Sequence, residues 1–304
     1  TGDDVYSFDP DTPFIMTLWD AGGIDTISAS NFSTDCRIDL REGHYSSLPI
    51  FSDPSITGLA NPPVVPPTPN DYDGTDNLAL AWGAVFENAV GGTGDDLLIG
   101  NGVANQLMGG DGNDLLEGGP GIDTALFKGT RSQFHLTTTA TNTWSVQDSR
   151  GLEGVDLLDD LERLQFADKK IALDLSPGDH GGQSLEFLGV LAPAAINNPE
   201  IVGLILGLFD QGSSLHDVFQ LAIDVHLVSQ LAGSGSNTDL ARLAFRNIVG
   251  AEADATTLDI LVSFMDGRSA SYSQSDFLTV VAGMEVNQTH IGLIGWQQTG
   301  IEYT

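Results

Sequence analysis

A nine-residue period between Gly91 and Leu126 constrains this chain more than any other feature. Four consecutive units begin at Gly91, Gly100, Gly109 and Gly118, and they read GGTGDDLLI, GNGVANQLM, GGDGNDLLE and GGPGIDTAL. Position six of each unit is aspartate or asparagine, and position eight is leucine or alanine. Because the period, the acidic position and the apolar position agree over four units, the pattern argues against a flexible Gly/Asp-rich loop.

The repeat predicts a parallel β-roll that binds calcium. Glycines at positions one, two and four permit turns with positive φ, and the last three residues form a short strand with position eight inward. Two units complete a coil, so Asp96 stacks on Asp114 and Asn105 stacks on Asp123. Carboxylates about 4.8 Å apart repel each other unless a cation lies between them. Calcium takes six to eight oxygen ligands, including the carbonyls that turns supply.

Composition narrows the possible partners. Asp and Glu number 42 against 11 Lys and Arg, for a net charge of -31. This balance argues against nucleic acid and anionic membrane surfaces as partners. A hydrophobic content of 41% is sufficient for real cores, and the single cysteine, Cys36, excludes an internal disulfide. The longest apolar run, Ile201 to Phe209, is too short to cross a membrane.

We expect a multidomain β + α chain, a parallel β-roll with nonapeptide calcium repeats followed by an all-α helical domain. The predicted domains are residues 1–126 (calcium-binding β-roll), 127–176 (hairpin and capping segment) and 177–304 (helical domain). Residues 155–173 would continue or cap the roll, and NPPVVPPTPN at residues 61–70 is expected to be an exposed loop. From Ser184 onwards apolar residues recur at helical spacing, which predicts about six helices. The start TGDDVYSF carries no methionine or signal peptide, so we expect it to lie within a larger protein.

Two segments carry a family resemblance. Residues 16–43 (MTLWDAGGIDTISASNFSTDCRIDLREG) and 82–102 (WGAVFENAVGGTGDDLLIGNG), together with GDDVYSF at residues 2–8, resemble the C-terminal domain of serralysin-type secreted metalloproteases. The resemblance covers residues 1 to about 126. The stretch AFRNIVGAEADATTLDILVSFMDG makes residues 177–304 weakly similar to helical modules appended to bacterial RTX repeat proteins.

The resemblance implies about four calcium ions and their ligands. Valine stands at position 85 where the family commonly has threonine, so only its carbonyl is expected to contribute. The unit from Phe127 lacks the glycines and the aspartate, so no fifth site of this type is expected. The implied ligand sets are Gly2, Asp4, Asp20, Gly22 and Asp25; Gly23, Asp25, Val85 and Glu87; Gly92, Gly94, Asp96, Gly109, Asp111 and Asp114; and Asn101, Val103, Asn105, Gly118, Pro120 and Asp123.

No catalytic residue is predicted. The catalytic half of the serralysin family needs H-E-x-x-H, and none of the six histidines here has that spacing or is followed by glutamate. One hypothesis is a non-catalytic calcium-binding C-terminal region of a secreted bacterial RTX protein. It would serve calcium-driven folding, type I secretion and attachment to another protein or a cell-surface component. The alternative is the C-terminal part of a secreted zinc metalloprotease or other hydrolase whose catalytic domain lies upstream of Thr1.

Overall fold

The computed structural model describes residues 2–50, 74–140, 142–268 and 271–304. It divides into two compact units, unit 1 (Thr1–Asp168) and unit 2 (Lys169–Thr304). The division lies eight residues before the boundary predicted at residue 176. Strand β16 (Lys170–Ala172) belongs to unit 2, where it pairs antiparallel with β17 (Ile301–Tyr303). The predicted proline-rich loop, residues 61–70, lies outside the described residues.

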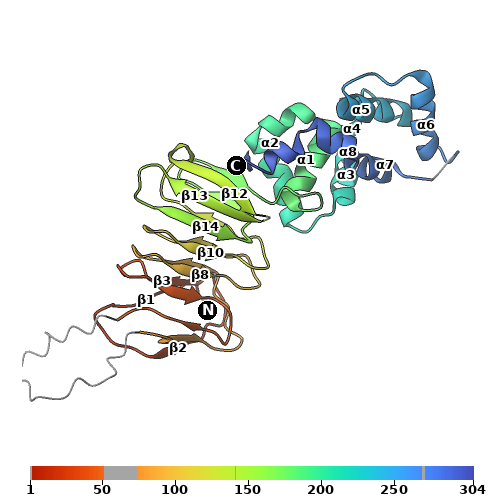
Figure 1. The fold of residues 1–304 in the computed structure, drawn as a ribbon. Helices are drawn as coiled ribbons and strands as arrows, with labels where there is room; N and C mark the ends of the chain where they lie inside the picture. Colours follow the sequence, from red (N-terminus) through yellow and green to blue (C-terminus); the bar gives the residue numbers. More distant parts are fainter. Residues whose placement is uncertain (1, 51–73, 141, 269–270) are drawn as a thin grey trace, which may run out of the picture. The chain divides into compact units, whose positions relative to one another are not determined.

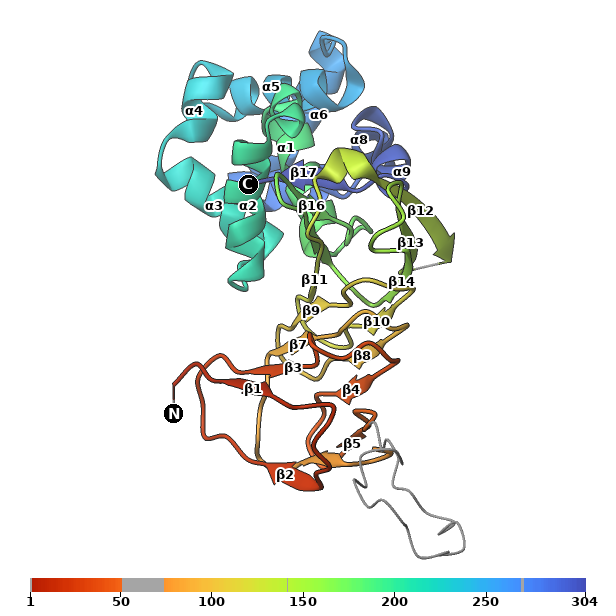
Figure 2. The same cartoon turned by 90° about the vertical axis from the view of Figure 1, so that its left-hand side faces the viewer.

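Unit 1 is built from short strands that alternate between two sheets (Figure 1, Figure 2). One sheet runs in parallel through β1 (Val5–Ser7), β3 (Thr26–Ser28), β7 (Asn88–Val90), β9 (Gln106–Met108), β11 (Thr124–Leu126) and β15 (Arg163–Gln165). The other runs in parallel through β4 (Arg37–Asp39), β8 (Leu97–Ile99), β10 (Leu115–Glu117) and β14 (Val155–Asp159). A smaller sheet joins β2 (Met16–Leu18), β6 (Leu78–Leu80) and β5 (Tyr45–Ser46).

The register of these strands follows the eighteen-residue spacing. Leu116 lies opposite Leu98, and Ala125 lies opposite Leu107. All four position-eight side chains are buried between the sheets, with exposed fractions of 1% or less. Burial of these side chains supplies the hydrophobic contribution that holds successive coils together.

The coil continues beyond the fourth unit. After Leu126 the chain forms η1 (Arg131–Gln133) and an antiparallel hairpin, β12 (Phe134–Ala140) and β13 (Thr143–Asp148). It then returns to the parallel sheets, where β14 pairs with β10 and β15 pairs with β11. Residues 155–165 therefore extend the coil, with β13 also pairing antiparallel along β14.

Unit 2 is helical around a buried central helix. Its helices are α1 (His180–Leu191), α2 (Pro199–Asp210), α3 (Leu215–Asp224), α4 (Leu227–Ala232), α5 (Asn237–Val249), α6 (Ala255–Met265), α7 (Gln274–Ala282), α8 (Glu285–His290) and α9 (Leu293–Trp296), with a 3-10 turn η2 (Pro193–Asn197). Helix α1 contacts α2, α5, α7 and α8 (Figure 1). The described residues hold nine α-helices where about six were predicted, because α4, α8 and α9 are too short to show helical periodicity. No described helix is long and apolar enough to span a membrane.

Candidate metal centre

Residues at the starts of the parallel strands form two side-chain ladders. Each member directly precedes its strand except Asp156, which is the second residue of β14 and is aligned with Asp114 by the register. The first ladder lies along the sheet that contains β9, and the second along the sheet that contains β8. Register places each member one coil from the next. The first ladder consists of Asp4, Asp25, Glu87, Asn105, Asp123 and Glu162, and the second of Cys36, Asp96, Asp114 and Asp156.

In the second ladder each backbone N–H donates to the carboxylate one coil later. Cys36 N donates to Asp96 Oδ1 (2.6 Å), Asp96 N to Asp114 Oδ1 (2.8 Å), and Asp114 N to Asp156 Oδ1 (2.9 Å). Gly92 N donates to the other oxygen of Asp96 at 2.6 Å. These bonds satisfy buried backbone donors and fix each carboxylate in the turn.

The first ladder repeats this arrangement with one interruption. Asp4 N donates to Asp25 Oδ1 (2.9 Å) and Asp25 N donates to Glu87 Oε2 (2.7 Å). Asn105 N donates to Asp123 Oδ1 (2.7 Å). Between these pairs the Asn105 amide Nδ2 donates to the Glu87 carbonyl (3.0 Å), so an uncharged amide stands where the neighbouring coils have carboxylates.

Three ladder carboxylates each have an unsatisfied oxygen. The Oδ2 atoms of Asp25, Asp114 and Asp123 are buried and have no hydrogen-bond partner among the described residues. Burial raises the pKa of Asp114 to about 7 and that of Asp123 to about 6. A buried carboxylate oxygen without a donor is costly unless a proton or a cation neutralises it. The fit to a hard, oxygen-binding cation such as calcium is therefore good at these positions.

A further group of carboxylates lies at the start of unit 1. Carboxylate oxygens of Asp4, Asp20 and Asp25 all lie within 4.8 Å of one another. The backbone N–H of Gly22 donates to Asp20 Oδ1 (2.9 Å) and the hydroxyl of Tyr6 donates to Asp20 Oδ2 (2.8 Å). These bonds lower the pKa of Asp20, the Gly22 bond most strongly, so this carboxylate is ionised at neutral pH. The cluster combines negative charge with oxygen ligands, as a calcium site requires.

The predicted carbonyl ligands lie against glycine turns. A Cβ atom at Gly110 would overlap the Gly92 carbonyl, and one at Gly112 would overlap the Gly94 carbonyl. The same relation holds between Gly23 and the Gly2 carbonyl, between Gly91 and that of Gly109, between Gly100 and that of Gly118, and between Gly121 and that of Val103. Glycine therefore allows the carbonyl groups of successive turns to lie close to the neighbouring turn.

The predicted ligands also include Asn101, Pro120, Val85 and Asp111. Asn101, Gly118 and Pro120 line one cavity of about 300 Å³. Val85 is exposed, and its side chain offers no ligand atom. Asp111 contacts the Lys128 ammonium at 3.4 Å through its side chain, which leaves its carbonyl for the predicted role.

Sequence reasoning missed two ladder residues, Asp156 and Glu162. Glu162 Oε2 accepts from Asp123 N at 2.8 Å, and Asp156 stacks on Asp114 as described above. The signal was present, because GLEGVDLLD from Gly151 has glycine at positions one and four, aspartate at six and leucine at eight. The intervening insertion at residues 127–150 broke the period and hid it.

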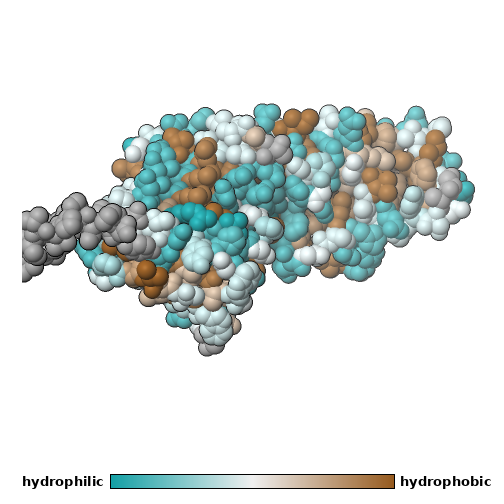
Figure 3. Space-filling view, turned by 60° about the horizontal axis from the view of Figure 1, so that its bottom comes forward, coloured by the Kyte–Doolittle hydropathy of each residue, from teal (hydrophilic) through white to brown (hydrophobic). Residues whose placement is uncertain are grey.

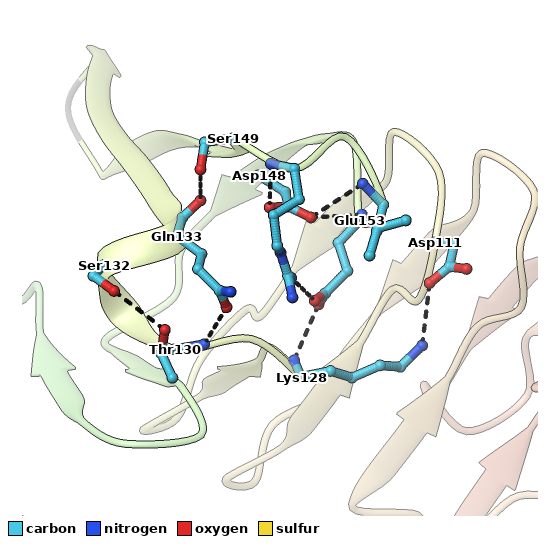
Figure 4. A network of polar contacts seen from close by, with 10 residues as sticks. Asp111, Lys128, Thr130, Ser132, Gln133, Asp148, Ser149 and Glu153 are labelled. Carbon is cyan, nitrogen blue, oxygen red and sulfur yellow. Dashed lines mark hydrogen bonds and ion pairs between the residues drawn. The ribbon is translucent and has the colours of Figure 1, made fainter.

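Acidic groups of this added coil and of an earlier turn contact basic residues (Figure 4). Arg150 pairs with Asp148 (2.9 Å) and Glu153 (3.0 Å), and the backbone N–H of Lys128 donates to Glu153 Oε2 (3.0 Å). Since the Lys128 ammonium reaches Asp111 in the preceding turn, protein cations neutralise part of the negative charge here.

Known proteins resemble about a third of this chain. The relatives matched include serralysin G of Dickeya chrysanthemi (36% identical over 113 residues, 33% of this chain and 19% of the relative), serralysin of Proteus mirabilis (34% over 113 residues, 33% and 18%) and serralysin of Photorhabdus luminescens (37% over 93 residues, 31% and 14%). The chain spans less than a fifth of the length of these curated relatives. An extracellular lipase, LipA of Serratia marcescens, matches at 22% identity with a TM-score of 0.17, over 28% of this chain and 16% of that one.

The family model described as peptidase M10 serralysin C terminal matches residues 1–53 and 71–174. The matched ranges contain both ladders, including Asp156 and Glu162. Because they make up over half of the sequence, the chain belongs to the peptidase M10 serralysin C-terminal family.

Proposed function

We propose that unit 1 is a calcium-loaded parallel β-roll, the non-catalytic C-terminal region of a secreted bacterial protein that folds on meeting calcium outside the cell. The unsatisfied Oδ2 atoms of Asp25, Asp114 and Asp123 are the observation that carries this proposal. Calcium would neutralise carboxylates that burial otherwise makes unfavourable when ionised.

The proposed ions take the four implied ligand sets. Asp4, Asp20 and Asp25 would hold the first ion, and Asp25 with Glu87 the second. Asp96 and Asp114 would hold the third with carbonyls of the adjoining turns. The fourth would have Asp123 as its charged ligand, because Asn105 is uncharged, and we therefore expect it to bind calcium most weakly.

Calcium binding of ordinary strength is sufficient to switch folding. Extracellular calcium modules have dissociation constants of about 0.1–1 mM. At ten times the dissociation constant each ion stabilises the fold by about 1.4 kcal/mol, and four ions together by about 6 kcal/mol. That sum is comparable to the whole stability of a typical domain, about 5–15 kcal/mol.

Hydrogen exchange with mass spectrometry, in calcium and in excess EGTA, tests the proposal. Peptides from residues 91–126 should lose protection when calcium is removed, and magnesium should not restore it because it dehydrates reluctantly. Unchanged protection after verified metal removal would rule out calcium-driven folding.

Export by a type I system with an uncleaved C-terminal signal is part of this proposal. Low cytosolic calcium would leave the ladders unfolded until export. Deletion of the last ~60 residues should abolish secretion, whereas Asp114→Ala, which removes the ligand oxygens altogether, should impair calcium-driven folding but not export. Normal secretion of the truncated chain would refute this signal.

A second candidate is the C-terminal part of a secreted zinc metalloprotease. The observation in its favour is that the relatives named above are serralysins. An H-E-x-x-H motif upstream of Thr1 in the full coding sequence, with chelator-sensitive casein cleavage, would support it. A full-length protein with neither that motif nor the catalytic residues of another hydrolase would decide for the non-catalytic proposal.

A further inference from the structure

Unit 2 contains an apolar groove between α5, α6, α7 and the start of α8. Its volume is about 310 Å³, and all twelve lining residues are aliphatic or aromatic. Phe245, Phe264 and Phe277 contribute rings from three different helices, and Met284 contributes a flexible side chain. Figure 3 shows hydrophobic atoms exposed at the end of unit 2 that carries α6 in Figure 1.

None of the described residues fills the groove. Val280 is 48% exposed, and Val249, Tyr272 and Val286 are each more than 40% exposed. Helix α6 lines the groove through Leu261 and Phe264, and only its Val262 and Ser263 are buried although most of its residues are apolar. Exposed apolar side chains gathered around one opening mark an interaction site more often than single exposed residues do.

The lining chemistry favours apolar side chains of a protein over a small polar ligand. Small-molecule pockets place a few polar groups to orient the ligand. Here the Tyr272 hydroxyl is the one polar side-chain group among the lining residues. An amphipathic helix needs no such group, because its backbone is satisfied internally and its apolar face supplies the contact.

The charge of the segment that forms the groove favours basic residues beside the apolar face of that helix. Between Ala244 and Val286 the sequence contains six acidic residues and two arginines. Both arginines are already paired, Arg246 with Glu252 (3.8 Å) and Arg268 with Asp259 (2.9 Å). The segment that supplies every lining residue is therefore net negative, which favours a basic partner.

We infer that the groove binds an amphipathic helix of a partner protein, with large apolar residues at spacings of three, four and seven and with lysine or arginine beside them. The helix seats two or three side chains in the groove, and its basic residues pair with acidic side chains of the segment between Ala244 and Val286. Met284 adapts to the shape of the inserted side chains.

Fluorescence anisotropy of the full chain in calcium tests this inference. The probe is a labelled peptide of leucine and lysine, LKKLLKLLKKLLKL, and its matched counterpart carries glutamate at every lysine position. The lysine peptide should bind at least ten times more tightly than the glutamate peptide, and its affinity should fall at 500 mM NaCl. Val280→Asp places a charge at the groove and should weaken binding at least ten-fold.

The matched control is Leu204→Asp, which changes a 67% exposed apolar residue on α2 and should leave binding unchanged. Circular dichroism melting checks that both variants fold, and Val286→Asp replaces Val280→Asp if the latter melts early. Equal binding of the two peptides, or binding insensitive to the groove variants, overturns the inference. Groove-dependent binding of the uncharged dye N-phenyl-1-naphthylamine without peptide binding also overturns it, in favour of a small-molecule pocket.

Discussion

Replacing Asp114 with asparagine should have opposite effects with and without calcium. Asp114 is 2% exposed, and its Oδ2 has no partner among the described residues. Asparagine keeps an oxygen for the hydrogen bond from Asp96 N but removes the charge. The calcium-free fold should therefore become more stable at pH 8, while the stabilisation that calcium adds should become smaller.

The magnitudes follow from the pKa of Asp114, which burial raises from its ordinary 3.8 to about 7. Ionisation of this group in the calcium-free fold then costs about 4 kcal/mol, at 1.4 kcal/mol for each pKa unit. Asparagine avoids this cost of ionisation. Its buried NH2 group, which has no assured acceptor, offsets about 1–3 kcal/mol of the stability gained in this way. We expect a net gain of about 1–3 kcal/mol without calcium, and a loss of about 2.7 kcal/mol in the calcium increment at one hundred times the dissociation constant.

The pH dependence supplies an internal check. A folded pKa above the ordinary value means that stability is lost as pH rises through about 7. The gain from Asp114→Asn in EGTA should therefore be present at pH 8 and absent at pH 5.

Hydrogen exchange of peptides covering residues 91–126, followed in urea, measures both the stability of the calcium-free fold and the stabilisation that calcium adds. Trimethylamine N-oxide can shift the equilibrium where the calcium-free chain is already unfolded. The control is Asp11→Asn, the same charge change at an exposed residue, and it should have little effect. Lower stability of Asp114→Asn in EGTA at pH 8, or an unchanged calcium increment, would refute the electrostatic reasoning.

Three other measurements address the turns, the added coil and unit 2. Gly112→Ala should destabilise unit 1 by about 2 kcal/mol or more in a urea titration, because φ is +124° and the added Cβ would overlap a carbonyl. The control Gly102→Ala, whose Cβ would point into open space, should change stability by less than about 0.5 kcal/mol. Equal effects of the two substitutions would contradict this prediction. Burial acts to raise the pKa of Asp148, but hydrogen bonds from Arg150 and nearby backbone N–H groups lower it to about 2. Its stabilisation is present above pH 3.8 and lost as pH falls through about 2, so Asp148→Asn should be less stable than wild type at pH 7 and approach it near pH 2; a constant difference would argue against this. Exchange protection of α1 and α5 should be the same in calcium and EGTA, because unit 2 lacks any repeated ligand spacing, and loss of protection in EGTA would show that its folding depends on unit 1.

The sequence alone was sufficient to predict those features of the fold that a local pattern encodes. The period places leucine at position eight and aspartate at position six, and the structure buries Leu98 and Leu116 and stacks Asp96 on Asp114. This works because a nine-residue unit encodes its own turn and strand, and repetition makes the next unit repeat the same backbone.

The tertiary structure decided whatever depends on pairing between distant residues. Asp156 joins the second ladder only because β14 pairs with β10 across an insertion that interrupts the period. Strand β16 likewise pairs with β17, about 130 residues later in the chain, which the sequence pattern did not predict. The apolar residues of α5, α6 and α7 predict helices but not the unfilled groove, because helical periodicity shows which face is apolar and only packing shows whether that face is covered.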